Sequence, residues 1–385
     1  MIPTFAMDAV TVPEASALAL RYYRSGNIIW LAEQLLGVAL PALFLFTGWS
    51  ARLRTFASGV ARGHFYPTLV VYMALVSLLV FVVQLPLTVY VGYLREHAYG
   101  LSAQRFSKFA VDQLKGLAVG LVIGAVVIWV PYLLLARSPD RWWLWTGALA
   151  LPFFTLMLLI GPVYIAPLFN RFGAMTDKAL ESQVLAVAAQ AGVEGARVFE
   201  VNKSVDTEKV NAYVTGIGQT KRIVLWDTLL ARLSPPETKF VVGHELGHYV
   251  LGHVWINIFI SWALTLAGLF AAHRTAGFLL ARFGDRFGFT TLADPASLPL
   301  LLLLLSLFSF LISPAALALS RHHEHAADRF GLDLTRDNHA AATAFVALQR
   351  QNLAVPRPGL LYKIFRASHP PIGERVDFIN AYRPR

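Results

Sequence analysis

Six long apolar segments constrain this chain more than any other feature of its sequence. A helix of about 20 mostly apolar residues crosses the hydrocarbon core of a bilayer. The sequence predicts spans at about Asn27–Gly48, Leu69–Tyr93, Gly116–Ala136, Trp142–Phe169, Val254–Ala272 and Leu298–Leu319. The expected fold is therefore predominantly α, a polytopic protein with about six transmembrane helices.

The composition supports a membrane protein. Hydrophobic residues make up 56% of the 385, and charged residues only 15%, against about 25% in soluble domains. The net charge is +10, but no basic run alternates with aromatic residues, so we expect no nucleic-acid partner. The chain contains no cysteine, which excludes disulfides, thiol nucleophiles and cysteine-ligated metals.

The apolar segments divide the chain into four parts. Residues 1–169 hold the N-terminal segment and spans one to four, 170–253 a less apolar loop, 254–319 spans five and six, and 320–385 a polar C-terminal part. The N-terminal stretch lacks the long apolar run of a cleaved secretory signal. Because basic residues favour the cytoplasmic side, we expect both termini and the long loop to lie in the cytoplasm.

The long loop has the pattern of a mixed α/β structure. We expect a helix at Thr176–Ala191, strands at Arg197–Val201, Asn211–Thr215 and Arg222–Trp226, and a turn at Gly216–Gln219. The run Ser234-Pro235-Pro236-Glu237 is typical of a helix start, with serine as N-cap and glutamate three residues later. The helix that begins there contains the most informative motif in the chain.

That motif is His-Glu-Leu-Gly-His at residues 244–248. On a helix, His244 and His248 lie one turn apart on one face, so both imidazoles can reach one metal ion. Glu245 lies about 100° around the helix, beside the ligands, where it can accept a proton from an activated water. The pattern is typical of a catalytic zinc site, which needs a third protein ligand.

Two residues compete for the place of third ligand. His253 follows His248 by five residues, about 140° further around a helix, so we regard it as a histidine at the membrane interface. Glu324 follows the sixth span, while His248 precedes the fifth, so two spans return Glu324 to the same side of the membrane. Asp328, one helical turn beyond Glu324, suits a carboxylate that orients a ligand imidazole. The alternative for Glu324 and Asp328 is an exposed pair bridged to Arg321 or Arg329.

Several motifs together resemble one known family. Ser320-Arg321-His322-His323-Glu324-His325-Ala326-Ala327-Asp328 is similar to the S-R-x-x-E-x-x-A-D box of the type I CAAX prenyl proteases, which are gluzincin-type membrane metalloendopeptidases. Further matches, in the family's order, are Arg95-Glu96-His97, Ala166–Asn170, Asn211-Ala212-Tyr213, Lys221–Leu225, Asp227–Leu230 and Ser368-His369-Pro370. The resemblance extends over most of the chain, with six spans where eukaryotic members have seven.

The resemblance implies a role for each matching residue. It implies one Zn²⁺ per chain, held by His244, His248 and Glu324, with Glu245 as general base. Asn211 and Ala212 would lie on an edge strand that pairs with the substrate backbone. His369 would stabilise the developing oxyanion, and Arg375 would assist it. The family's helices enclose an intramembrane chamber, which would accommodate Glu33 and Gln34 in the first span, and its catalytic domain is a cytosolic α+β domain of the gluzincin type.

We therefore expect a membrane-embedded zinc metalloendopeptidase similar to the CAAX prenyl proteases. Its partners would be the lipid bilayer and peptide or protein substrates, with C-terminally lipidated ones among the candidates. The cysteine-free composition, rich in arginine and alanine, favours a bacterial inner membrane, with the site facing the cytoplasm. Two alternatives remain: a quality-control protease of the heat-shock type, and a metal transporter. The spans are poor in ionisable residues, which disfavours the transporter.

Overall fold

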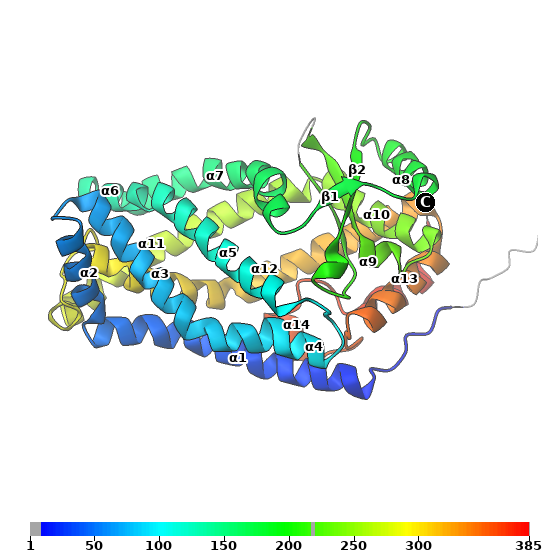
Figure 1. Ribbon diagram of the computed structural model, residues 1–385. Coiled ribbons are helices and arrows are strands. Elements are labelled where there is room, and N and C mark those ends of the chain that lie inside the picture. Colours follow the sequence, from blue (N-terminus) through cyan, green and yellow to red (C-terminus); the bar gives the residue numbers. More distant parts are fainter. Residues whose placement is uncertain (1–8, 217–219, 385) are drawn as a thin grey trace, which may run out of the picture.

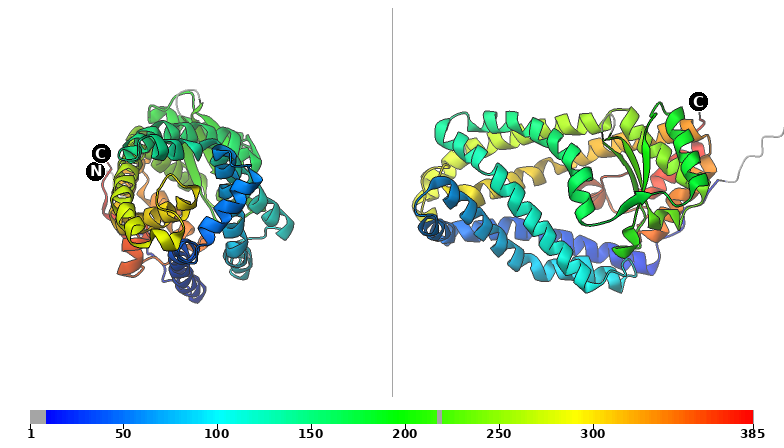
Figure 2. Two further views of the ribbon diagram at one scale, coloured as in Figure 1. Left: turned by 90° about the vertical axis from the view of Figure 1, so that its left-hand side faces the viewer. Right: turned by 45° about the horizontal axis from the view of Figure 1, so that its top comes forward.

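The computed structural model describes residues 9–216 and 220–384, most of which are helical. Long helices run side by side along one axis, and a small sheet with shorter helices lies at one end of them (Figure 1). Seen along that axis, the long helices surround a common centre (Figure 2). This arrangement confirms the predicted class: a predominantly helical membrane part combined with a small α+β part.

Six helices in the described part of the chain are long and apolar enough to cross a membrane, and each overlaps one predicted span. Their elements are α1 (Ala17–Phe46), α3 (Phe65–Val89), α4 (Arg95–Ala98), α5 (Phe106–Val127), α6 (Trp129–Arg137), α7 (Trp142–Ile160), α11 (His253–Phe287) and α12 (Leu298–Thr335). A π-helical turn at Tyr90–Leu94 joins α3 to α4, and another at Gly161–Ile165 follows α7.

The helices extend beyond their apolar segments. α1 begins at Ala17, ten residues before the predicted start, where the Ser16 hydroxyl accepts a hydrogen bond from the Ala19 amide at 3.1 Å. α11 continues to Phe287, well beyond the predicted end at Ala272. Apolar content locates the part of a helix that lies in lipid, whereas capping and packing decide where the helix ends.

Buried polar contacts close the end of the helices remote from the sheet. The short helix α2 (Trp49–Val60) begins beside Ser50, whose hydroxyl donates to the Ala296 carbonyl and shares a hydrogen bond with the Tyr72 hydroxyl, both at 2.6 Å. All three residues are buried, and these contacts connect α2, α3 and the turn before α12 through paired hydroxyl and carbonyl groups.

Polar side chains also meet inside the membrane part. Glu33 on α1 lines a pocket of about 400 Å³ together with Gln84 on α3 and Gln113 on α5. An ionisable residue within a span usually faces the interior of the bundle or water. The pocket therefore accounts for Glu33 in an otherwise apolar segment.

The sheet has four strands in the order β1-β2-β4-β3. Its strands are β1 (Phe172–Ala174), β2 (Arg197–Val201), β3 (Ala212–Thr215) and β4 (Arg222–Trp226). β2 and β4 are parallel, whereas β1 and β3 pair antiparallel with them at the two edges. The three predicted strands are present and β1 was missed, because three residues carry too little alternation to be recognised. The predicted turn at Gly216–Gln219 lies mostly outside the described residues.

The helices around the sheet enclose the core of the α+β part, which is called the catalytic part below because it contains the predicted catalytic motif. They are α8 (Lys178–Gln190), α9 (Asp227–Leu230), α10 (Pro235–Val250), α13 (Asn338–Gln351) and α15 (Ile372–Ala381), whereas α14 (Leu360–Phe365) packs on α12. α10 begins as predicted, with the Ser234 amide donating to the Glu237 carboxylate at 2.7 Å. The core contains Phe240 and Leu246 of α10 and Leu225 of β4, all almost completely buried. This core holds α10 rigidly against the sheet.

Two glycines let α10 approach α12 closely. A Cβ on Gly331 of α12 would lie 3.1 Å from the His244 amide nitrogen, and a Cβ on Gly247 of α10 would lie 3.1 Å from the Ala327 Cα. These separations are too short for a larger side chain without displacement of the backbone. The glycines therefore set the distance between the two helices that carry the metal-site motifs.

Candidate metal centre

The two histidines of the His-Glu-Leu-Gly-His motif lie one turn apart on α10 and point in the same direction. Their Nε2 atoms are 3.2 Å apart. The side chains are 8% and 22% exposed for His244 and His248, so neither nitrogen is freely hydrated. The spacing that predicted one shared face on a helix thus places both imidazoles at one point.

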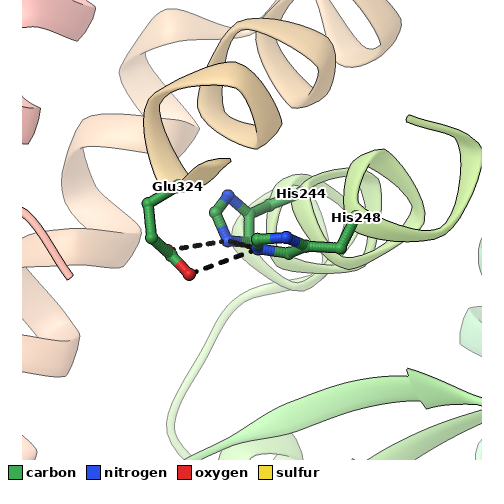
Figure 3. Close-up of side chains that lie close together, drawn as sticks. All are labelled: His244, His248 and Glu324. Atoms are coloured by element: carbon green, nitrogen blue, oxygen red, sulfur yellow. Dashed lines mark hydrogen bonds and ion pairs between the residues drawn. The ribbon is translucent and has the colours of Figure 1, made fainter. Parts of the chain in front are cut away.

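Glu324 of α12 completes a group of three (Figure 3). Its Oε2 lies 3.3 Å from His244 Nε2, and its Oε1 lies 3.3 Å from His248 Nε2. The structure therefore brings together the three residues that the sequence proposed as ligands. α12 continues from the sixth span through residue 324 without a break, and so delivers the carboxylate to α10 directly.

The chemistry of this group fits a metal cation. The buried Glu324 Oε2 has no hydrogen-bond partner among the described residues. Burial lowers the pKa of His244, but the close contacts with the Asp328 and Glu324 carboxylates outweigh burial and raise that pKa to about 9. Carboxylates that raise the pKa of an imidazole create a negative potential around it. The same potential stabilises a divalent metal ion. A metal ion could therefore be held by His244, His248 and Glu324.

Asp328 lies behind His244, on the side away from Glu324. Its Oδ1 is 2.9 Å from His244 Nδ1, and its side chain is completely buried. Contact of this kind fixes the tautomer and the ring orientation of a ligand imidazole. Asp328 occupies the position that the sequence suggested, one turn beyond Glu324 on the same helix.

Arg375 of α15 is buried and connects several acidic groups. Its Nε and Nη2 donate to the two Asp328 oxygens at 2.9 and 2.5 Å, and Nη2 lies 3.5 Å from Glu324 Oε2. Its guanidinium also stacks on Phe345, 3.9 Å from the ring centroid. The resemblance placed Arg375 with the substrate, whereas its contacts here are chiefly with the carboxylates around the ligands.

Glu245 differs from its neighbours in having no polar partner. Among the described residues its carboxylate accepts no hydrogen bond and forms no ion pair, and it lines a cleft of about 470 Å³ that opens beside His244. Burial raises the pKa of Glu245, because the charged form loses hydration and gains no donor. An unpaired carboxylate at this position can accept a proton from a water in the cleft.

His369 reaches the same group from the segment after α14. Its Nε2 lies 3.3 Å from Glu324 Oε1, and its Nδ1 shares a 2.8 Å hydrogen bond with the Ser368 hydroxyl. Arg321 of α12 holds this segment in place by donating to the carbonyls of Lys363 and Ala367 at 2.7 and 2.8 Å. The His369 side chain is 61% exposed, so it can contact a molecule in the cleft.

The edge strand β3 forms one wall of the cleft. Asn211 and Ala212 both line it, as does Glu245. The Trp226 amide donates to the Asn211 carbonyl at 3.2 Å, so the alternation of antiparallel pairing turns the Ala212 carbonyl away from β4. The Asn211 side chain accepts from the Ala212 amide at 2.9 Å.

Two contacts near the ligands were missed from the sequence. His253 does not belong to the metal group, but its Nδ1 lies 3.0 Å from His248 Nδ1, and its ring stacks on His323 with centroids 4.2 Å apart. The only sequence signal was a histidine directly after a glycine. Gly252 has a positive φ and precedes the first residue of α11, so the chain changes direction there. Spacing on one continuous helix could not have shown this.

Comparison with known proteins gives consistent matches over the whole chain. Residues 174–383 match the model of peptidase family M48, and residues 6–171 match that of the CAAX prenyl protease N-terminal region with five membrane helices. An uncharacterized metalloprotease of Bacillus subtilis, YhfN, is 36% identical over 95% of this chain and 85% of its own length. CAAX prenyl protease 1 of Saccharomyces cerevisiae is 27% identical, over 80% and 71% respectively. The crystal structure of S. mikatae Ste24p has a TM-score of 0.81 at 23% identity and covers 94% of this chain and 87% of its own, which shows the same fold.

Proposed function

Because this chain belongs to peptidase family M48 and is a multi-pass membrane metalloprotease, we propose that it is a zinc endopeptidase with His244, His248 and Glu324 as its ligands. In this proposal Glu245 is the general base. The substrates are peptide segments at the membrane. Proteins with C-terminally lipidated tails, as in CAAX processing, are the substrate class that the names of its relatives suggest.

The separation of the ligand atoms is the observation that carries the proposal. The two histidine Nε2 atoms are 3.2 Å apart, and each lies 3.3 Å from a different oxygen of Glu324. With one ligand atom taken from each residue, all three lie within 4.8 Å of one another. Zinc binds histidine nitrogen and carboxylate oxygen at about 2.0–2.1 Å in tetrahedral sites, and a tetrahedron of that size has edges of about 3.3 Å, which the distance between the two histidine nitrogens matches. Two histidines and one carboxylate are also a common protein ligand set of a catalytic zinc, which leaves one position open.

Zinc, when bound, supplies a Lewis acid that polarises the substrate carbonyl and makes water more acidic. Glu245 takes the proton from the attacking water, whose oxygen forms the new bond to the carbonyl carbon. When the C–N bond breaks, Glu245 returns that proton to the departing amine. His369, exposed at the edge of the cleft, donates to the oxygen that becomes negatively charged. Asp328 and Arg375 hold the His244 ring in the orientation that this geometry requires.

The substrate backbone pairs with β3. Its outward-facing carbonyl at Ala212 lies in the same cleft as Glu245, so an added strand would carry its peptide bonds past the metal group. Asn211, whose side chain accepts from the Ala212 amide, shapes this edge. The catalytic end faces the cytoplasm, as the distribution of basic residues in the loops indicates, and a bacterial inner membrane is the proposed location.

Replacement of the proposed base tests the assignment. The Glu245→Gln variant should retain bound metal but lose peptide cleavage by about 10²-fold or more, because the attacking water has no proton acceptor. The measurement is turnover of a quenched fluorescent peptide by the full-length protein in detergent, with metal content determined in parallel. Glu208→Gln is a matched control, because Glu208 forms an exposed ion pair with Arg232 remote from the metal group. Full activity in the Glu245→Gln variant would refute the assigned base.

The substrate class needs a separate experiment. Cells that carry the active protein can be compared with cells that carry the Glu245→Gln variant for membrane proteins that accumulate uncleaved. Accumulation of precursors with uncut C-terminal tails supports a processing role. Accumulation of misfolded membrane proteins of unrelated sequence would instead favour the quality-control alternative.

A further inference from the structure

Two arginines from distant parts of the chain converge beside a glycine of α1. The Nη2 atoms of Arg95 and Arg366 both lie within 4 Å of the position that a Cβ would occupy on Gly26, at 3.3 and 3.8 Å. Any larger residue at position 26 would occupy the space that the two guanidiniums face. A glycine therefore leaves room for a small group at a point of concentrated positive charge.

The positive charge around this point exceeds the negative charge. Glu96 lies 3.3 Å from Arg95 and also accepts from Lys209 at 2.7 Å. In the part of the chain that the structure describes, the Arg366 guanidinium has no carboxylate partner and donates a hydrogen bond only to the Asn27 side chain. Arg95 and Lys209 thus share one carboxylate, and Arg95 also donates to the Tyr22 carbonyl at 2.6 Å and to the Ser25 hydroxyl at 3.2 Å. The Arg366 guanidinium keeps donors free for another acceptor.

Both arginines line a pocket of about 220 Å³, and this pocket adjoins the cleft beside the metal group. The pocket and the cleft have six lining residues in common: Asn352, Ala354, Val355, Pro358, Tyr362 and Arg366. Tyr22, Tyr23 and Gly26 of α1 line the pocket but not the cleft. A peptide in the cleft that extends toward Arg366 would therefore meet a wall, which suits the end of a chain better than its middle.

One residue of the pocket is close in sequence to a residue that contacts the metal group. Arg366 precedes His369 by three residues, and His369 Nε2 lies 3.3 Å from Glu324 Oε1. Three residues of chain span at most about 11 Å, so the backbones of Arg366 and His369 are no further apart than that. An extended peptide covers such a distance with about three residues. A group held by Arg366 can therefore belong to the same short peptide that reaches the metal group.

We propose that Arg366 and Arg95 form a subsite for the C-terminal carboxylate of the substrate. The inference rests on the proposed endopeptidase function and specifies how that site selects a peptide. Arginine binds carboxylates through paired N–H donors, and a half-buried guanidinium without an acid is the group that such a ligand would satisfy. The free carboxylate then holds the end of the chain against α1, with the bond to be cut lying toward the metal.

Binding by a protein that cannot cleave separates this subsite from catalysis. The probe is a short fluorescein-labelled peptide of neutral residues, made with either a free C-terminal carboxylate or a C-terminal amide. It is titrated against metal-loaded full-length Glu245→Gln protein in detergent, with anisotropy as the readout. The free acid should bind about tenfold more tightly than the amide, because only the acid accepts charge-assisted hydrogen bonds.

Second substitutions locate the effect. Arg366→Gln should remove the preference for the free acid and leave binding of the amide within about twofold. Gly26→Val should also remove it, because the new side chain fills the pocket while both arginines remain. Arg366→Lys should keep part of the preference, since the charge is retained without the paired donors. Arg357→Gln, which removes an exposed arginine paired with Asp377 in the same segment, is the matched control and should retain the full preference.

Three outcomes would overturn the proposal. One is equal binding of acid and amide; another is a preference that survives both Arg366→Gln and Gly26→Val. The third is tight binding of an amidated peptide with glutamate as its last residue, which would assign the pocket to acidic side chains. If the preference is present but the wild-type protein cleaves neither peptide, the endopeptidase proposal fails and the carboxylate subsite stands.

Discussion

The contact between Asp328 and His244 leads to a prediction at the scale of single residues. Asp328→Asn removes the negative charge behind His244 Nδ1 and leaves Arg375 with a neutral partner. Metal affinity should fall by about 10–100-fold, because the imidazole loses the group that orients it. The measurement is the metal retained by the purified full-length protein against increasing concentrations of a competing chelator.

A carboxylate on the same helix provides the control. Asp333 lies further along α12 and accepts from the Tyr382 hydroxyl at 3.1 Å, away from the metal group. Asp333→Asn should leave metal affinity unchanged. Equal metal retention in Asp328→Asn and wild type would show that Asp328 does not support the ligand.

At this scale the sequence could predict residues whose relation follows from helix geometry or from counting spans. His244 and His248 meet because they are four apart on a helix, and Glu324 meets them because two spans return it to the same side. The contact of Arg375 with Asp328 could not be predicted, because α15 reaches α12 only through the packing of the C-terminal part. The contact of His253 with His248 depends on a change of helix direction at Gly252.

At the scale of elements, the close packing of α10 on α12 is the feature that holds the site together. Gly331→Ala would place a Cβ 3.1 Å from the His244 amide nitrogen, in contact with the backbone. The helices would have to separate by a few tenths of an ångström, which displaces Glu324 from the imidazoles. We expect a loss of about 1–3 kcal/mol of stability together with weaker metal binding. Thermal unfolding in detergent and metal content measure both.

Gly277→Ala is the matched control for this substitution. Gly277 lies within α11, and a Cβ there would meet nothing within 4 Å. Alanine favours a helix over glycine by up to about 1 kcal/mol, so this variant should be as stable as the wild type or more stable. If Gly331→Ala behaved in the same way as Gly277→Ala, close approach of α10 and α12 would not be required.

Elements were predictable where composition changes sharply and less so where it does not. The six spans and three of the four strands follow from runs of apolar or β-branched residues. The breaks were not predicted: α5 and α6 separate near Ile128, and π-helical turns follow α3 and α7. Such breaks arise from packing against neighbouring helices, which leaves no periodic signal in the sequence.

At the scale of the whole molecule, Asp206 connects the membrane part to the catalytic part. Its carboxylate contacts Lys108 of α5 at 2.7 Å and accepts from Asn170 and Lys203 at 2.6 and 3.0 Å. Burial alone would raise the pKa of Asp206, but the hydrogen bonds from these three residues outweigh it and lower that pKa. The folded protein therefore favours the charged form more than the unfolded chain does.

This shift sets the direction of a pH dependence. The contribution of Asp206 to stability is fully present above the ordinary aspartate pKa of about 3.9, and it is lost as pH falls through the lower folded value. Asp206→Asn should cost about 2 kcal/mol at neutral pH, and its difference from the wild type should shrink as the solution becomes more acidic. Unfolding curves of both proteins across that range measure it; a difference that stays constant to low pH would contradict the assignment.

The overall division into a helical membrane part and a small α+β part was predictable from hydropathy alone. How the two parts meet was not, because contacts such as Asp206 with Lys108 join residues about a hundred positions apart through polar side chains. Hydropathy identifies what lies in lipid, and polar pairing between loops has no comparable signature. The family resemblance supplied part of what hydropathy could not, through motifs distributed over both parts.

The continuous helix α12 connects the thickness of the bilayer to the position of the metal group. A rod of 38 residues is about 57 Å long, so each degree of tilt moves one tip relative to the other by about 1 Å. Bilayer thickness influences the tilt of such a rod. Gly247 and Gly331 allow α10 to pack closely on α12. We therefore expect the side chains of the metal group to move together and to keep their mutual spacing. We therefore expect bilayer thickness to change the alignment of this unit with β3 rather than the spacing within the metal group.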